Sequence, residues 1–414
     1  MFRFVYGILT CFSLFGMSPF ARADSLNVYI DADFSISQRA AEAIELGVQT
    51  ALAEVGHQVG GVTLNVVRKD HRANSKRTLS NLRAFQKDPR AIAVVGGALS
   101  PPYLTHQQFI NGNGILLLLP WSAAGPITRA RPDQENWIFR LSVDDTKAGP
   151  FLVSRALKAA HCDRTALLLI DTGWGRANSS TMQAAFSAAG EDVPQVFMFS
   201  AGLGSASARS LAQTVALARP DCVIMLASAD SGALLINELH QAIPDVKVIS
   251  HWGILAGDFL QRIPAETRAE MELEVLQTCG LRVERDGSDI LVNALEGASR
   301  GGTVFRNLAD VASSTGFVHG YDLTKVFLSA LGEAAKSPDW PDASIEKRRS
   351  MVRGMLENLP APVPGILKTY DPPFQPYASD RPDAHEALGL SDLCMAAFSE
   401  DGHLVLADSA DQGH

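Results

Sequence analysis

The stretch Ile92-Ala93-Val94-Val95-Gly96-Gly97 is an uninterrupted apolar run that ends in small residues and leads to a hydroxyl at Ser100. The stretch Ile115-Leu116-Leu117-Leu118-Leu119-Pro120 repeats this pattern and leads into Trp121-Ser122-Ala123. Short apolar runs without alternation are typical of parallel strands that are buried on both faces. In open parallel sheets, ligands bind outside the carboxyl ends of the strands. The two runs therefore predict a site for a small polar ligand at that edge.

The segments before these runs alternate between strand and helix patterns. Val28-Tyr29-Ile30 predicts a strand, and the apolar residues from Ile44 to Val55 recur at the spacing of one helix face. Val62 to Val66 predicts another strand, and Ser75 is the expected N-cap of another helix. Such a series predicts a mainly parallel, doubly wound sheet.

The same alternation begins again near Asp144 and predicts a second α/β lobe. Its expected strands are Thr165–Ile170, Val196–Phe199, Cys222–Leu226 and Val246–Ser250. The fold class is therefore α/β, with two doubly wound lobes built on mainly parallel sheets.

The first 23 residues have the features of a cleavable secretory signal peptide. Arg3 precedes an apolar run, and Ala21-Arg22-Ala23 supplies the small residues of a cleavage site before Asp24. No later stretch reaches the roughly 18 apolar residues that a membrane helix needs. We therefore expect a protein that is exported to the periplasm.

The net charge and the cysteines restrict which partners, metals and cofactors we expect. The net charge of -9 argues against a nucleic-acid binder, which needs a basic surface. After removal of the leader, four cysteines allow three pairing schemes: Cys162, Cys222, Cys279 and Cys394. Cys222 lies in an apolar strand, so a buried free thiol is an equal alternative there. Without a CxxC or a mixed Cys/His cluster, we expect neither a metal nor a cofactor.

Enzyme motifs are nearly absent, and we expect a protein without catalytic activity. Gly297-Ala298-Ser299-Arg300-Gly301 matches GxSxG, but a nucleophile elbow needs a buried strand before the serine. A secreted hydrolase that uses Ser299 or His251 is a distant alternative.

The loops after the expected strands carry hydroxyls, aromatic rings and a few acids. If two lobes bring these loops together, they form an aromatic-walled cleft with a few polar groups, as small-molecule sites do. Core packing is the alternative for each tryptophan. The candidate ligand-binding residues are Asp33, Ser100, Trp121, Ser122, Ala123, Trp174, Asp230, His251 and Trp252.

The chain resembles the type I periplasmic solute-binding proteins, in the branch similar to the leucine/isoleucine/valine-binding proteins of ABC transporters. The residues that carry the resemblance follow one another in the family's order. They are Val94 to Ser100, Gly114 to Pro120, Phe139-Arg140 with Asp144-Asp145, Gly173-Trp174-Gly175, and Tyr370-Asp371 with Gly402.

The resemblance implies two lobes that are joined by three crossovers and close on a ligand. The crossovers are expected near Val143, Cys279 and Pro360. The first lobe would then contain residues 24–143 and 280–359, and the second residues 144–279 and 360–414.

The resemblance also assigns roles to several candidates. Ser100, Ser122 and the backbone at Ala123 match positions that hold a ligand carboxylate, and Trp174 matches an aromatic cover. Asp230 lies close to a further lining position. The family's acid for a ligand ammonium aligns with His251 or Trp252, so an α-amino acid would need Asp33 or Asp230 in its place.

Two classes of small organic ligand fit these residues. An aromatic or aliphatic carboxylate would use the serines and backbone N–H groups. A cationic ligand would use Trp121, Trp174 and Trp252 as a cage. The expected partner is the permease of an ABC importer, and the alternative is a sensor role for a membrane histidine kinase or cyclase.

Overall fold

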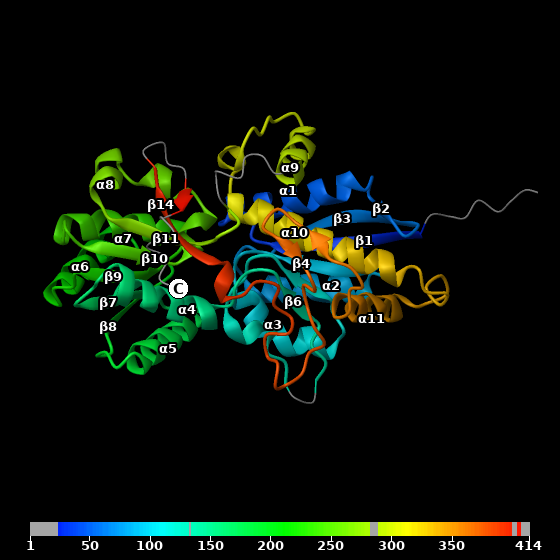
Figure 1. The fold of residues 1–414 in the computed structure, drawn as a ribbon, viewed down its shortest axis with the longest axis horizontal. Coiled ribbons are helices and arrows are strands. Elements are labelled where there is room, and N and C mark those ends of the chain that lie inside the picture. Colours follow the sequence, from blue (N-terminus) through cyan, green and yellow to red (C-terminus); the bar gives the residue numbers. More distant parts are fainter. Residues whose placement is uncertain (1–23, 132–133, 282–288, 400–403, 407–414) are drawn as a thin grey trace, which may run out of the picture.

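The chain folds into two α/β lobes that lie side by side along the long axis of the molecule (Figure 1). The computed structural model describes residues 24–131, 134–281, 289–399 and 404–406. The expected signal peptide lies outside the described residues. Among the helices described, none is both long and apolar enough to cross a membrane.

The first lobe is built on a six-stranded sheet that is parallel except at one edge. The strand order is β2 (Gln58–Val59), β3 (Val62–Asp70), β1 (Asp24–Ala32), β4 (Ala91–Gly96), β5 (Leu117–Leu119) and β6 (Ile138–Arg140). Only the β2–β3 pair is antiparallel. The two apolar runs that open the sequence analysis form the neighbouring strands β4 and β5, as predicted.

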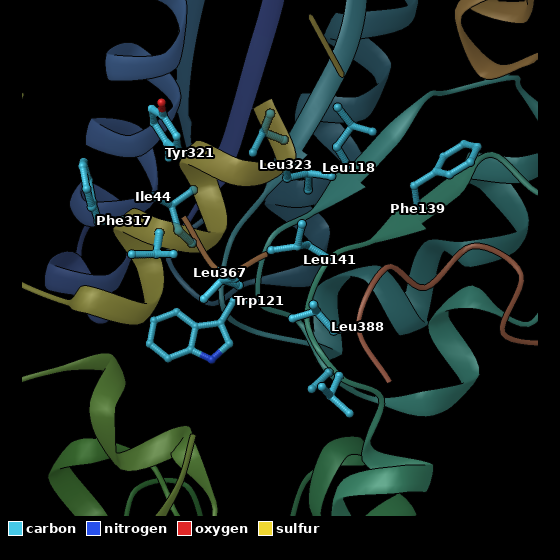
Figure 2. Close-up of a cluster of buried hydrophobic side chains, with 14 of the residues drawn as sticks. Ile44, Leu118, Trp121, Phe139, Leu141, Phe317, Tyr321, Leu323, Leu367 and Leu388 are labelled. Carbon is cyan, nitrogen blue, oxygen red and sulfur yellow. The ribbon is translucent and has the colours of Figure 1, made fainter. Parts of the chain in front are cut away.

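Helices cover both faces of this sheet, which explains why its strands β4 and β5 are apolar throughout. Leu116 and Leu118 contribute to one hydrophobic cluster, whereas Leu117 and Leu119 contribute to another. Successive side chains of a strand point to opposite faces, so both faces must be buried. The helices of this lobe are α1 (Gln38–Glu54), α2 (Ser75–Lys87), α3 (Pro101–Gly112), α9 (Asp289–Ser299), α10 (Ser314–Ala334) and α11 (Ile345–Leu356). Figure 2 shows part of the first cluster, with Trp121 at its edge facing the second lobe.

The second lobe is built on a seven-stranded sheet. The strand order is β15 (Leu404–Leu406), β14 (Leu393–Phe398), β11 (Leu273–Thr278), β10 (Lys247–Ser250), β9 (Cys222–Leu226), β7 (Thr165–Ile170) and β8 (Gln195–Phe199). Its helices are α4 (Asp145–Ser154), α5 (Gly173–Ala188), α6 (Ser205–Leu217), α7 (Ala229–Ala242) and α8 (Ala265–Glu270). Strands β14 and β15 are antiparallel to their neighbours, and the other strands are parallel. The predicted two-lobe α/β fold is therefore confirmed.

The prediction of Ser75 as a helix cap is wrong by one residue. Asn74 precedes α2, and its side-chain oxygen accepts the N–H groups of Lys76 and Arg77. An asparagine at this position caps a helix as well as a serine does, so the two residues compete for the role in the sequence.

The segment after the expected crossover near Pro360 keeps contact with the first lobe. A two-stranded ribbon, β12 (Val363–Pro364) and β13 (Thr369–Tyr370), is anchored to α10 by Asp322, which accepts the N–H groups of Ile366 and Leu367. Residues 371–392, here called the C-terminal strap, then run over the first lobe (Figure 1). We therefore propose that the chain re-enters the second lobe at Leu393, where β14 begins.

A buried group of charges attaches the C-terminal strap to the end of β6 and the start of α4. Arg140 ends β6, and its fully buried guanidinium donates to Glu386 of the strap at 2.6 Å. Arg129 contacts both Glu386 and Asp144, and Lys147 of α4 lies 3.0 Å from Glu386. Asp144 also caps α4 by accepting the N–H of Thr146. We call these five residues the hinge charge cluster.

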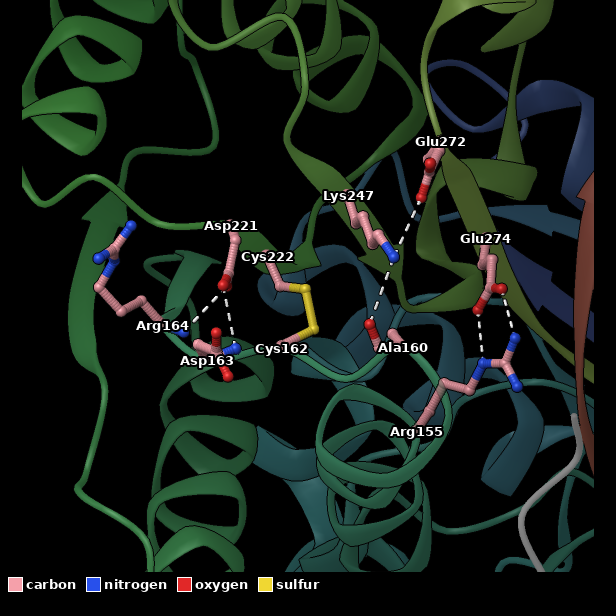
Figure 3. The surroundings of a disulfide bond; sticks show 10 residues. All are labelled: Arg155, Ala160, Cys162, Asp163, Arg164, Asp221, Cys222, Lys247, Glu272 and Glu274. Carbon is pink, nitrogen blue, oxygen red and sulfur yellow. Dashed lines mark hydrogen bonds and ion pairs between the residues drawn. A yellow bond between two sulfur atoms is a disulfide. The ribbon is translucent and has the colours of Figure 1, made fainter.

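Two disulfides show how the four cysteines pair. Cys162 pairs with Cys222 at the start of β9, so Cys222 is not a free thiol (Figure 3). Cys279 follows β11 and pairs with Cys394 in β14. The second bond therefore links the segment after β11 to β14, the antiparallel strand beside it.

Removal of the Glu386 carboxylate leaves the buried charge of Arg140 without its main partner. We expect Glu386→Ala to lower the free energy of unfolding by about 3–5 kcal/mol. The control is Glu333→Ala, which breaks an exposed pair with Lys336 and should change stability by less than about 1 kcal/mol. Urea denaturation of both variants gives the comparison, and equal losses would contradict a structural role for the cluster.

The same carboxylate makes part of the stability depend on pH. Burial alone would raise the pKa of Glu386, but the charges of Arg140, Arg129 and Lys147 outweigh burial and hold this pKa well below its usual range. A lowered carboxyl pKa stabilises the fold above the unfolded value of about 4.3, and this contribution is lost as the pH falls below it. The stability difference between the natural protein and Glu386→Gln should therefore shrink in acid. A constant difference between about pH 7 and pH 3 would contradict this.

Candidate functional site

The candidate site lies where the carboxyl ends of the two sheets meet between the lobes. Contacts from both sides define the interface. The backbone N–H of Asp145 donates to the carbonyl of Ala123 at 2.9 Å, and Trp174 of the second lobe packs against the first lobe's cluster around Tyr103. An exposed ion pair between Arg39 and Asp258 bridges the rim at 3.1 Å. Such rim pairs contribute little, so the buried contacts dominate this interface.

On the first lobe, the two predicted serines lie together after β4 and β5. Ser100 Oγ accepts the N–H of Ala124 at 3.2 Å, which leaves its own proton able to donate to a ligand. Ser122 Oγ donates to the carbonyl of Gly97 at 2.7 Å and is fully buried. Ser122 therefore stabilises the loop that holds Ser100, and Ser100 is the better candidate for direct contact with a ligand.

On the second lobe, aromatic rings form a continuous row that crosses to the first. Trp174 lies in the first turn of α5 and is edge-to-face with His251, at 5.2 Å between ring centroids. His251 has the same arrangement with Trp252 at 5.3 Å. Trp252 in turn lies 6.3 Å from His319 of α10, a helix of the first lobe. The row therefore joins the end of β10 to the opposite lobe.

The three interface tryptophans differ in exposure. Trp121 and Trp252 are each 2% exposed and belong to the main hydrophobic cluster, which is the core-packing alternative of the sequence analysis. Trp174 is half-buried and packs against clusters of both lobes. Of these three tryptophans, Trp174 is therefore the one with an accessible ring face.

His251 is joined to an acid that the sequence analysis did not place in the site. Its Nε2 donates to Asp145 Oδ1 at 2.8 Å, and both side chains are buried. The sequence does contain a feature that points to Asp145, because two acids, Asp144 and Asp145, are adjacent at the start of α4. Asp144 caps the helix, so the cap does not require Asp145, and Asp145 was therefore a candidate for another role.

The two acids proposed as substitutes for the family's ammonium acid have other partners. The Asp33 carboxylate accepts the N–H groups of Ser35, Ile36 and Ser37, and so stabilises the turn before α1. Asp230 is exposed and pairs with Arg262 at 3.3 Å. The structure therefore does not place either one beside His251.

One cysteine–aspartate cluster and two cavities among the described residues lie apart from the predicted site residues. Cys162, Cys222 and Asp221 lie close enough together for a metal, but the sulfurs are bonded to each other (Figure 3). Asp221 accepts the N–H groups of Asp163 and Arg164. A cavity of about 470 Å³ lies within the second lobe, and one of about 170 Å³ lies between the lobes beside Arg39 and Thr315.

The GxSxG segment lacks the geometry of a nucleophile elbow. Ser299 is the last residue of α9, and its hydroxyl donates to the carbonyl of Leu295 at 2.7 Å. The serine therefore ends a helix instead of following a strand, which is the position that the elbow requires.

Sequence comparison identifies the family of this two-lobed structure. The periplasmic binding protein family matches residues 32–266, which is more than half of the chain. The chain belongs to this family. A search among curated proteins finds no match to the sequence.

Solved structures confirm that the fold is that of the type I periplasmic binding proteins. A leucine binding protein from Thermotoga maritima is 14% identical, with a TM-score of 0.72 over 92% of this chain and 98% of that one. A solute binding protein of an ABC transporter from Rhodopseudomonas palustris, solved with p-hydroxybenzoic acid, has a TM-score of 0.73 at 14% identity over 93% and 96%. A branched-chain amino acid binding protein from Streptococcus pneumoniae, solved with isoleucine, has a TM-score of 0.72 at 13% identity over 93% and 99%.

The difference in burial between two tryptophans of the row predicts different effects on stability. Trp252→Ala removes a buried side chain that contacts both lobes, and should lower the free energy of unfolding by about 3–5 kcal/mol. Trp174→Ala, at a half-buried position, should lower it by about 1 kcal/mol. Chemical denaturation of the two variants without ligand tests this, and similar losses would show that the difference in burial does not determine the effect.

Proposed function

We propose that the protein captures a small organic solute between its lobes in the periplasm and presents it to an ABC importer. The observation that carries this proposal is the convergence of polar and aromatic groups from both lobes at one interface. Ser100 contributes a hydroxyl from the first lobe, and Trp174 and His251 contribute rings from the second. A ligand that touches both lobes stabilises the closed arrangement over the open one, because it binds the two states with different affinity.

The geometry supports a carboxylate ligand over a quaternary ammonium ligand. A cation cage needs several exposed aromatic faces around one position. Trp121 and Trp252 are buried in packing contacts, so Trp174 alone has a face available for a ligand. Ser100 and the backbone N–H groups after β5 can donate to a carboxylate instead. The similar structures with isoleucine and p-hydroxybenzoic acid hold carboxylate ligands as well.

The same features support the role of a non-catalytic receptor. The family consists of binding proteins, and Ser299 lies at a helix end without the geometry of a nucleophile. Presentation to a permease fits the similar protein from Rhodopseudomonas palustris, which is a solute binding protein of an ABC transporter. Sensing for a membrane kinase or cyclase uses the same closure, and no contact among the described residues favours it over transport.

Ligand binding should raise thermal stability, because the solute binds the folded chain alone. We expect one member of a panel of aromatic and aliphatic carboxylates to add about 2.7 kcal/mol at a concentration one hundred times its Kd. Differential scanning fluorimetry identifies it, and calorimetry should give one ligand per chain. Trp174→Ala should weaken binding at least tenfold, whereas Trp174→Phe keeps a ring and should retain most of the affinity. Turnover of a substrate without any stabilising ligand would contradict the proposal.

A further inference from the structure

A buried acid of the first lobe, Asp31, is only partly hydrogen-bonded. It is the last residue but one of β1 and is 1% exposed. Asn81 of α2 donates to its Oδ1 at 2.6 Å, whereas its Oδ2 has no hydrogen-bond partner among the described residues. Most buried polar atoms in folded proteins have a partner, so a half-paired carboxyl group in the core needs an explanation.

The hydroxyl of Tyr103 connects the end of β1 to the segment from Gly97 to Ser100, here called the serine loop. This hydroxyl donates to the backbone carbonyl of Asp31 and accepts the N–H of Gly97 at 2.7 Å. The carbonyl of Gly97 in turn accepts the hydroxyl of Ser122 at 2.7 Å. The serine loop is therefore held from two sides, and one of these sides is joined directly to Asp31.

Close packing makes this connection stiff. A Cβ atom at Gly96 would lie 2.9 Å from a ring carbon of Tyr103, and one at Gly97 would lie 3.0 Å from Cβ of Ala32. The ends of β1 and β4 and the tyrosine ring thus touch without spare space. Because protein interiors are close-packed, a displacement at the end of β1 is transmitted to the serine loop.

The charged groups of the neighbouring strands do not neutralise Asp31. Asp70 at the end of β3 and Asp33 in the turn after β1 are acids themselves. Lys69 is the partner of Asp31 across the β1–β3 pair, but its ammonium group lies over the ring of Tyr29, 5.5 Å from the centroid. The nearest cation of the sheet is therefore directed to an aromatic ring.

The remaining neighbours of Asp31 are uncharged. His71 follows β3 and is fully buried, and this burial lowers its pKa and favours the neutral ring. The residues that face the acid from α2 and α3 are Thr78, Asn81 and Tyr103. An ionised Asp31 consequently has one amide donor and no counter-ion among these groups.

The surroundings place the titration of Asp31 near neutral pH. Burial raises its pKa to about 7, the charge of Asp70 raises it further, and the hydrogen bond from Asn81 opposes the rise. The neutral acid fits this enclosed position, whereas the ionised form loses its hydration without gaining a second donor. Loss of the proton therefore favours any movement of β1 that admits water.

We propose that Asp31 makes the position of the serine loop depend on pH: loss of its proton weakens the contacts through which Tyr103 holds the loop, and so shifts Ser100. This inference rests on the proposed function, because the loop matters to the cell only if it binds a solute. The pH dependence itself is a property of the chain without ligand. The site should bind its solute more tightly below neutral pH than above it.

Thermal unfolding tests whether Asp31 takes up a proton in the fold. The unfolded carboxyl has a pKa of about 3.9, so the fold loses stability from Asp31 as the pH rises from there toward the higher folded value. Asp31→Asn keeps the shape without the charge. It should melt within about 1 °C of the natural protein at pH 4 and at least about 3 °C above it at pH 8. Asp245→Asn, an exposed control, should show no such gain.

Hydrogen exchange of the Gly97 amide, read by NMR without ligand, tests the connection to the serine loop. After correction for the intrinsic exchange rate, its protection in the natural protein should fall at least about threefold between pH 6 and pH 8. Asp31→Asn should remove this pH dependence, and Asp245→Asn should retain it. Tyr103→Phe removes the acceptor of the Gly97 N–H and should give low protection at both pH values.

The two measurements separate the ways in which the inference can be wrong. If Asp31→Asn gives no gain in stability at pH 8, Asp31 does not titrate as proposed. If the gain is present but the protection of Gly97 does not depend on pH, Asp31 is not connected to the loop, and the inference is equally overturned. Neither measurement uses a ligand, so a carboxylate panel without any binder contradicts the proposed function and leaves the result for Asp31 intact.

Discussion

The buried guanidinium of Arg140 determines how the hinge of this protein is assembled. Its charge lies at the end of β6, out of contact with solvent, and its main partner Glu386 comes from 246 residues later in the chain. A buried charge without its partner costs several kcal/mol, so the first sheet reaches its full stability only when the C-terminal strap has docked. The strap in turn brings the chain to Leu393, where the second sheet receives its antiparallel strand.

The same cluster links this constraint to the candidate site. Arg129 contacts Asp144, which caps α4, and the next residue is Asp145 of the interface. The position of the His251–Asp145 pair therefore depends on a helix start that the hinge charges hold.

The parts of the fold that follow from local pattern were predictable. Runs such as Ile92 to Gly97 and Ile115 to Pro120 have no polar face, and only a sheet covered on both faces buries them completely. The helix cap at Asn74 instead of Ser75 was not predictable with the same certainty, because either residue can cap a helix. The cysteine pairing could not be predicted for another reason. It depends on distances between strands that are far apart in the sequence.

The sequence by itself determined the fold class, the two lobes and the edge at which Ser100 and Ser122 lie, because periodicity and strand ends are local properties. Only the tertiary structure decided the role of each side chain. In the structure, Trp121 and Trp252 are buried in the core. Asp33 stabilises a turn, and Asp230 lies on the surface. His251 is hydrogen-bonded to Asp145. Burial and hydrogen-bond partners arise from elements that meet across the lobes. A single position in the sequence does not contain that information.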